Sequence, residues 1–104
     1  MTLAGKSALV TGASGALGSA IAQRLAAQGA SVWLHAFSRA AAVQALAQTI
    51  AAAGGRAQPI VFDLGDDAAT RAACERLLQD GPVQIIVNNA GVHDDAVFPA
   101  LRAE

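Results

Sequence analysis

The chain has 104 residues, of which 54% are hydrophobic and only 4% aromatic, and this length and composition fit one small domain with an apolar core. No apolar run approaches the roughly 20 residues that a membrane-spanning helix needs, and the N-terminus lacks the basic and apolar segments of a signal peptide. The one cysteine, Cys74, excludes an intrachain disulfide and is typical of a reducing compartment, so we expect a cytoplasmic protein.

The net charge of −1 conceals an asymmetry along the chain. Residues 1–62 contain four basic side chains and no acidic one, whereas residues 63–104 contain eight acidic and three basic side chains. A first half without carboxylates favours an anionic ligand. It is too weakly basic and too poor in aromatic residues to indicate nucleic-acid binding.

Four short apolar runs alternate with helix-length segments. We expect buried parallel strands at residues 7–11, 31–36, 58–62 and 84–88. The segments between them have apolar residues at helical spacing, which form the expected faces Leu17–Ile21–Leu25, Val43–Leu46–Ile50 and Ala73–Leu77–Leu78. This alternation predicts right-handed crossovers and an α/β fold, a parallel sheet covered by helices on both faces, without an internal domain boundary.

The expected helix ends agree with this pattern. Gly29, Gly54-Gly55 and Gly81-Pro82 are typical of the ends of the three helices. Ser38 and Asp66 can cap the starts of the second and third helices.

The first strand leads into the first helix through Thr11-Gly-Ala-Ser-Gly-Ala-Leu-Gly18. The N-terminus of a helix has N–H groups without internal acceptors and a partial positive charge, and glycines let a pyrophosphate approach the backbone. A glycine-rich stretch is a weak signal alone, but here a strand precedes it and a helix follows. The context therefore predicts a dinucleotide-binding turn.

Two more segments follow this turn: Phe62-Asp63-Leu64 at the end of the third expected strand and Asn88-Asn-Ala-Gly91 after the fourth. With these motifs the whole chain resembles the N-terminal part of the short-chain dehydrogenase/reductase family, in particular its 3-oxoacyl-acyl-carrier-protein reductases. The resemblance implies a Rossmann-like doubly wound sheet with strand order 3-2-1-4, in which residues 1–104 are a partial dinucleotide-binding domain without the catalytic half. One departure is Ala16, where the family usually has glycine; we expect it to be tolerated with somewhat weaker binding.

The end of the second strand indicates which dinucleotide binds. NAD enzymes commonly carry an acid about 20 residues after the turn, and here Ala36 stands at that position. Ser38 can donate a hydrogen bond and Arg39 a charge-assisted one to a 2′-phosphate, so we predict NADP(H) rather than NAD(H). In the alternative interpretation, Arg39 is an ordinary solvated residue of the second helix.

The resemblance also implies roles for the other two motifs. Asp63 is expected to accept a hydrogen bond from the adenine amino group, with Leu64 against the ring; helix capping is the alternative for Asp63. Asn89 and Ala90 are expected to contact the cofactor and Asn88 to brace the sheet. The full predicted cofactor site is Gly12, Ala13, Ser14, Gly15, Leu17, Gly18, Ser38, Arg39, Asp63, Leu64, Asn89, Ala90 and Gly91.

Members of the family protonate the substrate with a tyrosine, assisted by a lysine four residues later. This chain has no tyrosine, and its one lysine, Lys6, precedes the first strand. We therefore expect no catalytic residue and no turnover by this polypeptide alone, and interpret it as one segment of a longer NADPH-dependent enzyme. That enzyme is expected to reduce 3-oxoacyl thioesters on an acyl carrier protein in fatty acid biosynthesis, as a tetramer. The alternative is a nonenzymatic NADP(H)-binding module or a relic.

The remaining polar and aromatic residues receive structural interpretations. His35 is expected to be a packed polar residue near the adenosine end, Trp33 a packing residue of the second strand and Cys74 a semi-buried helical residue. His93, Asp94 and Asp95 are sequential neighbours that cannot all reach one ion, so we expect a solvated loop and no metal.

Overall fold

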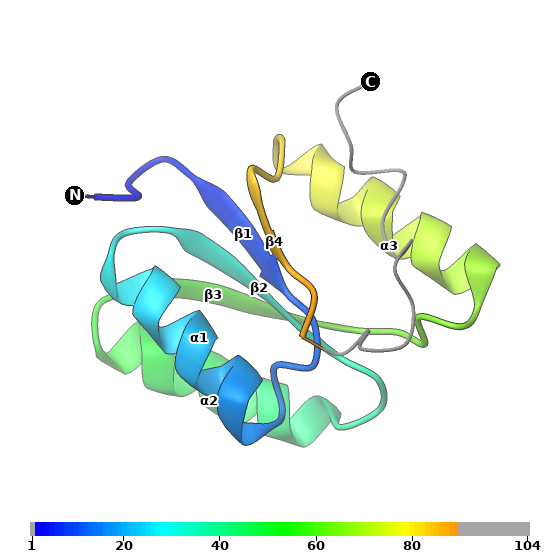
Figure 1. Cartoon of the computed structure of the whole chain (residues 1–104), viewed down its shortest axis with the longest axis horizontal. Coiled ribbons are helices and arrows are strands. Elements are labelled where there is room, and N and C mark those ends of the chain that lie inside the picture. The colour runs from blue at the N-terminus through cyan, green and yellow to red at the C-terminus, as the bar shows by residue number, and fades with distance from the viewer. Residues whose placement is uncertain (1, 90–104) are drawn as a thin grey trace.

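The computed structural model describes residues 2–89, which form a four-stranded parallel sheet with helices between consecutive strands (Figure 1). The strand order is β3-β2-β1-β4, which confirms the order that the family resemblance implied. The elements are β1 (Ser7–Val10), α1 (Ala16–Ala27), β2 (Ser31–Ala36), α2 (Ala40–Ala52), β3 (Arg56–Val61), α3 (Asp67–Gln79) and β4 (Ile85–Val87).

Three of the four expected strands have different ends in the structure. β3 begins at Arg56 rather than at residue 58 and ends at Val61, because its ladder with β2 runs from the Ser31–Arg56 pair to the Ala36–Val61 pair. β4 is limited to the three residues that pair with Ala8, Leu9 and Val10. β1 ends at Val10, so Thr11 begins the turn that follows. Only β2 has the expected bounds.

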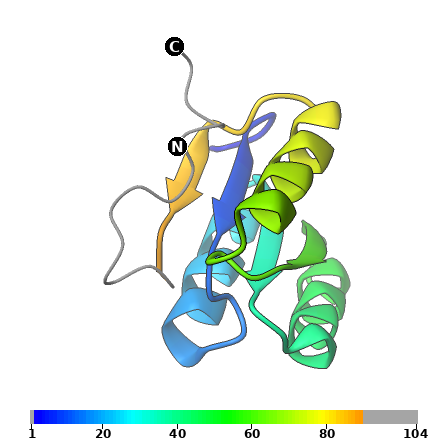
Figure 2. The same ribbon diagram turned by 90° about the vertical axis from the view of Figure 1, so that its right-hand side faces the viewer.

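Helices α1 and α2 lie together on one face of the sheet, and α3 crosses the other face (Figure 2). Successive residues of a strand point to opposite faces, so Ala8 and Val10 join the core under α1 and α2 while Leu9 joins the core under α3. Trp33 belongs to this second core, as expected, and so does Cys74, which is buried rather than semi-buried. No helix in the described part of the chain combines the length and apolar character needed to cross a bilayer.

The face that α1 buries differs from the expected one. Its buried residues are Gly18, Ala22 and Ala26, whereas Leu17 is 65% exposed and the expected leucine–isoleucine face is therefore wrong at its first member. Small side chains let the helix axis approach the sheet closely, and this contact displaces the larger residues to the flank.

The other two helices agree better with their apolar patterns. α2 buries Val43, Leu46 and Ile50, as expected. α3 buries Leu77, but Leu78 is 39% exposed, so the expected face is wrong at that residue. The buried Cys74 takes its place because the helix turns this residue toward the sheet.

The two expected helix caps have different outcomes. The N-cap of α2 is Arg39, which makes no side-chain capping bond, so the cap assigned to Ser38 is wrong; the helix begins one residue too late for it. Asp66 caps α3, since its Oδ1 accepts a hydrogen bond from the Ala69 N–H at 3.0 Å.

We expect Asp66→Ala to lower the free energy of unfolding by about 1 kcal/mol, because the Ala69 N–H then loses its acceptor. Ser38→Ala, the matched control, should change it by less than about 0.5 kcal/mol. Urea unfolding of the three proteins measures both values. Equal losses in the two variants would contradict this assignment of the caps.

Candidate functional site

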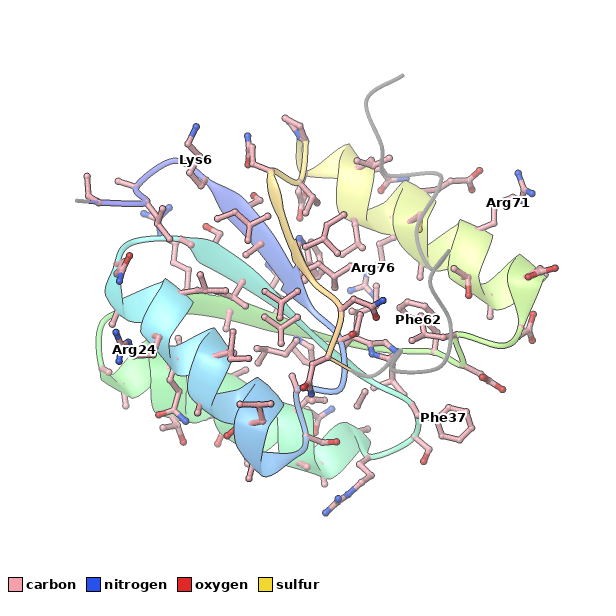
Figure 3. The ribbon with its side chains drawn as sticks, viewed as in Figure 1. Lys6, Arg24, Phe37, Phe62, Arg71 and Arg76 are labelled. Atoms are coloured by element: carbon pink, nitrogen blue, oxygen red, sulfur yellow. The ribbon has the colours of Figure 1, made fainter. Side chains whose placement is uncertain are left out.

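The predicted binding segments meet at one edge of the sheet. Because all strands are parallel, the turn after β1, the loop after β2, the loop after β3 and residues 88–89 after β4 all follow carboxyl ends of strands. Doubly wound sheets bind ligands at this edge. Lys6 precedes β1 and lies at the opposite edge (Figure 3).

The turn between β1 and α1 is closed by its own backbone and by β2. The Gly15 N–H donates to the Gly12 carbonyl at 3.3 Å, and the Ala13 N–H donates to the His35 carbonyl at 2.8 Å. Gly12 has a φ of +66°, a conformation that side chains rarely tolerate. Gly18 packs on this glycine so closely that a Cβ there would overlap the Gly12 oxygen and lie 2.9 Å from its carbonyl carbon.

The first turn of α1 is open to an anion. Its N-cap, Gly15, makes no side-chain capping bond, and the first turn contains no acidic residue. The N–H groups at this end therefore have neither a capping oxygen nor a nearby carboxylate in α1 that would compete for them. Ala16, which stands where the family usually has glycine, is the first residue of α1 and is exposed. It has an ordinary helical conformation that does not require glycine.

Residues after β4 hold the turn from its other side. The Thr11 N–H and hydroxyl donate to the Val87 carbonyl at 3.0 and 3.3 Å, and the hydroxyl lies 3.4 Å from Asn88 Oδ1. Asn89 Nδ2 donates to the Gly12 carbonyl at 3.2 Å. Asn88 thus makes the kind of bracing contact expected of it, while Asn89 also braces the turn and its contact with a cofactor stays a prediction. Ala90 and Gly91 lie outside the described residues.

Thr11 braces the turn, a role that the sequence analysis did not assign to it. It is buried and joins the first residue of the turn to the end of β4. Its position directly before the first glycine of the turn was the available signal, but a threonine there does not show which strand its hydroxyl reaches.

His35 lies beneath the turn and is 1% exposed, which confirms the expectation of a packed polar residue. Its Nδ1 is 3.2 Å from the Gly12 nitrogen and its Nε2 is 2.9 Å from the Phe62 oxygen. Burial lowers the pKa of His35 below its ordinary value, and the Phe62 carbonyl opposes this change to a smaller extent.

The segment after β3 also has a defined local structure. Asp63 Oδ1 accepts a hydrogen bond from the Gly65 N–H at 2.8 Å, and the side chain is exposed. Leu64 is half-buried against the core under α3. The capping role belongs to Asp66, which leaves the exposed Asp63 carboxylate as a candidate hydrogen-bond acceptor for a ligand.

The loop after β2 is exposed throughout. Phe37, Ser38 and Arg39 follow the strand directly, and Phe37 projects outward with 63% exposure, away from the inward-turned Phe62 (Figure 3). The structure therefore places Ser38 and Arg39 at the same edge as the turn and Asp63, with no hydrogen bond that assigns their roles.

The possible metal ligands and the one cysteine were expected to have no functional role. Within residues 2–89 no three His, Cys, Asp or Glu side chains are arranged to hold a metal ion. His93, Asp94 and Asp95 lie outside the described residues. Burial raises the pKa of the Cys74 thiol, which keeps it in the less nucleophilic protonated form.

Comparison with known sequences identifies close relatives. A family model described as short chain dehydrogenase matches residues 6–104. A 3-oxoacyl-acyl-carrier-protein reductase from Pseudomonas aeruginosa is 40% identical over 103 residues, which is 98% of this chain and 41% of that protein. An uncharacterized oxidoreductase from Methylorubrum extorquens is 38% identical and matches over 98% of this chain and 42% of its own length. The chain thus spans about two-fifths of the length of these relatives.

Solved structures show the same similarity. A metagenomic short-chain oxidoreductase in complex with NADP superposes with a TM-score of 0.83 at 40% identity, over 88% of this chain and 42% of that one. A short chain dehydrogenase from Burkholderia cenocepacia, also in complex with NADP, has a TM-score of 0.80 at 44% identity, over 90% of this chain and 39% of that one.

Proposed function

The chain belongs to the short-chain dehydrogenase family, and from this premise we propose that it is the NADP(H)-binding segment of a ketoreductase. The two similar structures described above hold NADP, which supports this cofactor. NADPH, when bound, supplies the hydride for reduction of a carbonyl.

The observation that carries the proposal is the turn between β1 and α1. Gly18 lets α1 pack so closely on the turn that a Cβ there would overlap the Gly12 oxygen, and the uncapped N-terminus of α1 has no acidic residue in its first turn. Such a turn suits a pyrophosphate, which needs close backbone approach and hydrogen-bond donors. The predicted contacts of Ala13, Ser14, Gly15 and Leu17 are part of the same proposal.

The preference for the phosphorylated dinucleotide rests on charge. β2 ends at the buried Ala36, where an NAD enzyme would commonly have an acidic residue. The first acidic side chain in the sequence is that of Asp63. A ribose 2′-phosphate would therefore meet Ser38 and Arg39 and no acidic side chain of that loop.

We further propose that the parent enzyme reduces a 3-oxoacyl thioester carried by an acyl carrier protein. The similarity to the Pseudomonas reductase supports this substrate class. The chain has no tyrosine, so the proton for the developing alkoxide would come from a group that this segment does not supply. The same observation favours a second candidate, a nonenzymatic NADP(H)-binding module.

The reading frame beyond Glu104 and the intact mass of the natively expressed protein separate these candidates. A heavier protein with a Tyr-x-x-x-Lys motif supports the ketoreductase. A stop codon after Glu104 supports the module.

We expect calorimetric titration of the purified chain to show NADPH binding at least about tenfold tighter than NADH binding, because one charge-assisted contact contributes about 1.5 kcal/mol or more. Adenosine 2′,5′-bisphosphate should compete, and no NADPH oxidation should occur with an acetoacetyl thioester. Equal affinity for NADPH and NADH would refute the cofactor preference. Absence of binding to a folded sample would refute the proposed function.

A further inference from the structure

His35 connects two segments of the proposed site that are far apart in the sequence. Its ring lies between the Gly12 nitrogen in the turn from β1 to α1, called here the phosphate turn, and the carbonyl of Phe62. Phe62 directly precedes Asp63. Its own carbonyl accepts the Ala13 N–H at 2.8 Å, so both its backbone and its side chain hold the turn. The Phe62 ring stands edge-on to the imidazole, with 4.5 Å between ring centroids and 60° between planes.

The two hydrogen-bond partners determine where the imidazole carries its proton. A backbone N–H can only donate, so Nδ1 must be an unprotonated acceptor for Gly12. A backbone carbonyl can only accept, so Nε2 must carry the hydrogen that bonds Phe62. Only the neutral Nε2–H form satisfies both, because a protonated ring would direct an Nδ1–H at the Gly12 N–H.

We propose that His35 is a positioning residue that, in its neutral Nε2–H form, aligns the phosphate turn with the adenine-side segment of the cofactor site. The inference rests on the proposed function, because it assigns Gly12 and Asp63 to one ligand. The ring holds both segments through backbone groups, so it sets their separation without contacting the cofactor.

The surroundings of the ring make this alignment dependent on pH. Burial lowers the pKa of His35 from 6.5, so below pH 6.5 the unfolded chain binds more protons at this position than the folded chain. The contribution of neutral His35 to the free energy of unfolding is therefore fully present above pH 6.5, and it is lost as the pH falls toward the lowered pKa. The charged side chains of the neighbouring segments are all exposed, namely Arg39, Asp63, Asp66, Asp67, Arg71, Glu75 and Arg76.

The first test compares NADPH binding by the unmodified chain, His35→Asn and His35→Leu between pH 7.5 and 5.5, in samples whose folded fraction is measured by circular dichroism. In the unmodified chain the dissociation constant should rise more steeply than in His35→Asn as the pH falls toward the lowered pKa of His35, since an amide can accept from Gly12 and does not titrate. His35→Leu should weaken binding about tenfold at every pH, roughly the effect of one lost hydrogen bond.

All other groups that titrate in this pH range, including the cofactor 2′-phosphate, are common to the three proteins, so the difference between the proteins isolates position 35. A purely structural role would change the folded fraction but leave the affinity of folded protein unchanged. That result, or an identical pH profile in His35→Asn, would overturn the inference while leaving the proposed function intact.

The second test needs no cofactor and no variant that must fold. Nitrogen-15 spectra of the chain should show the Nε2–H form of His35, and the amide resonances of Gly12 and Asp63 should both shift as His35 titrates. An Nδ1–H form, or a Gly12 resonance that ignores the titration, contradicts the inference. If NADPH does not bind at all, the proposed function fails, and coupled shifts would then show an alignment that serves no NADP(H) site, which also rejects the inference.

Discussion

Gly18→Ala is expected to destabilise the chain by about 1–3 kcal/mol and to distort the phosphate turn. The added methyl group would overlap the Gly12 oxygen and lie 3.0 Å from the Ala13 Cα, and all of these atoms belong to backbone that the surrounding hydrogen bonds hold in place. Relief would require α1 to move away from the turn, which would separate the N-terminus of the helix from Gly12 and Ala13. Thermal or urea unfolding measures the loss of stability, and NADPH titration measures the loss of affinity.

Gly15→Ala is the matched control, three residues earlier in the same turn. A Cβ at this position would meet only the Gly12 oxygen, at an ordinary contact distance of 3.7 Å, and Gly15 has a φ of −86° that alanine adopts without strain. We expect its free energy of unfolding to change by less than about 0.5 kcal/mol. Similar destabilisation by the two variants would show that Gly18 is not held by its contact with Gly12.

Arg39→Glu is expected to weaken NADPH binding by about 10- to 100-fold, since it removes a charge-assisted hydrogen bond of about 1.5–3 kcal/mol and places a carboxylate near the 2′-phosphate. Binding of NADH, which has no such phosphate, should change little. The ratio of the two dissociation constants, measured by calorimetry on the same preparations, therefore reports the interaction directly.

Arg56→Glu provides the control for the change in net charge. Arg56 is also exposed, but it begins β3 and so lies at the opposite edge of the sheet from Arg39. Only the variant at position 39 should change the cofactor preference. If both variants lower NADPH affinity equally, the effect is general electrostatics and Arg39 has no specific role.

The element types followed from local patterns because each pattern has a local physical cause. An apolar run of strand length, such as 31–36, has few stable alternatives to a buried strand, and β2 has those bounds. The Asp66 cap could be predicted because the capping carboxylate and the N–H group that donates to it, that of Ala69, lie three residues apart. Ser38 shows the limit of this reasoning, since a shift of one residue in the helix start removes the cap.

Part of the candidate site could also be predicted from the local sequence. The glycine pattern of the turn indicates close packing of helix on strand, and Gly18 confirms it by its contact with Gly12. The roles of Ser38, Arg39 and Asp63 toward a ligand stay predictions that the binding experiments test.

By itself, the sequence determined the alternation of strands and helices, the turn that opens α1, and the family. The tertiary structure decided which side chains meet: Gly18, Ala22 and Ala26 rather than Leu17 face the sheet, Asn89 bonds Gly12 across 77 positions, and His35 reaches the same glycine across 23. The reason is physical, because short-range periodicity and capping arise from neighbouring residues, whereas these contacts exist only after β2 and β4 have both paired with β1.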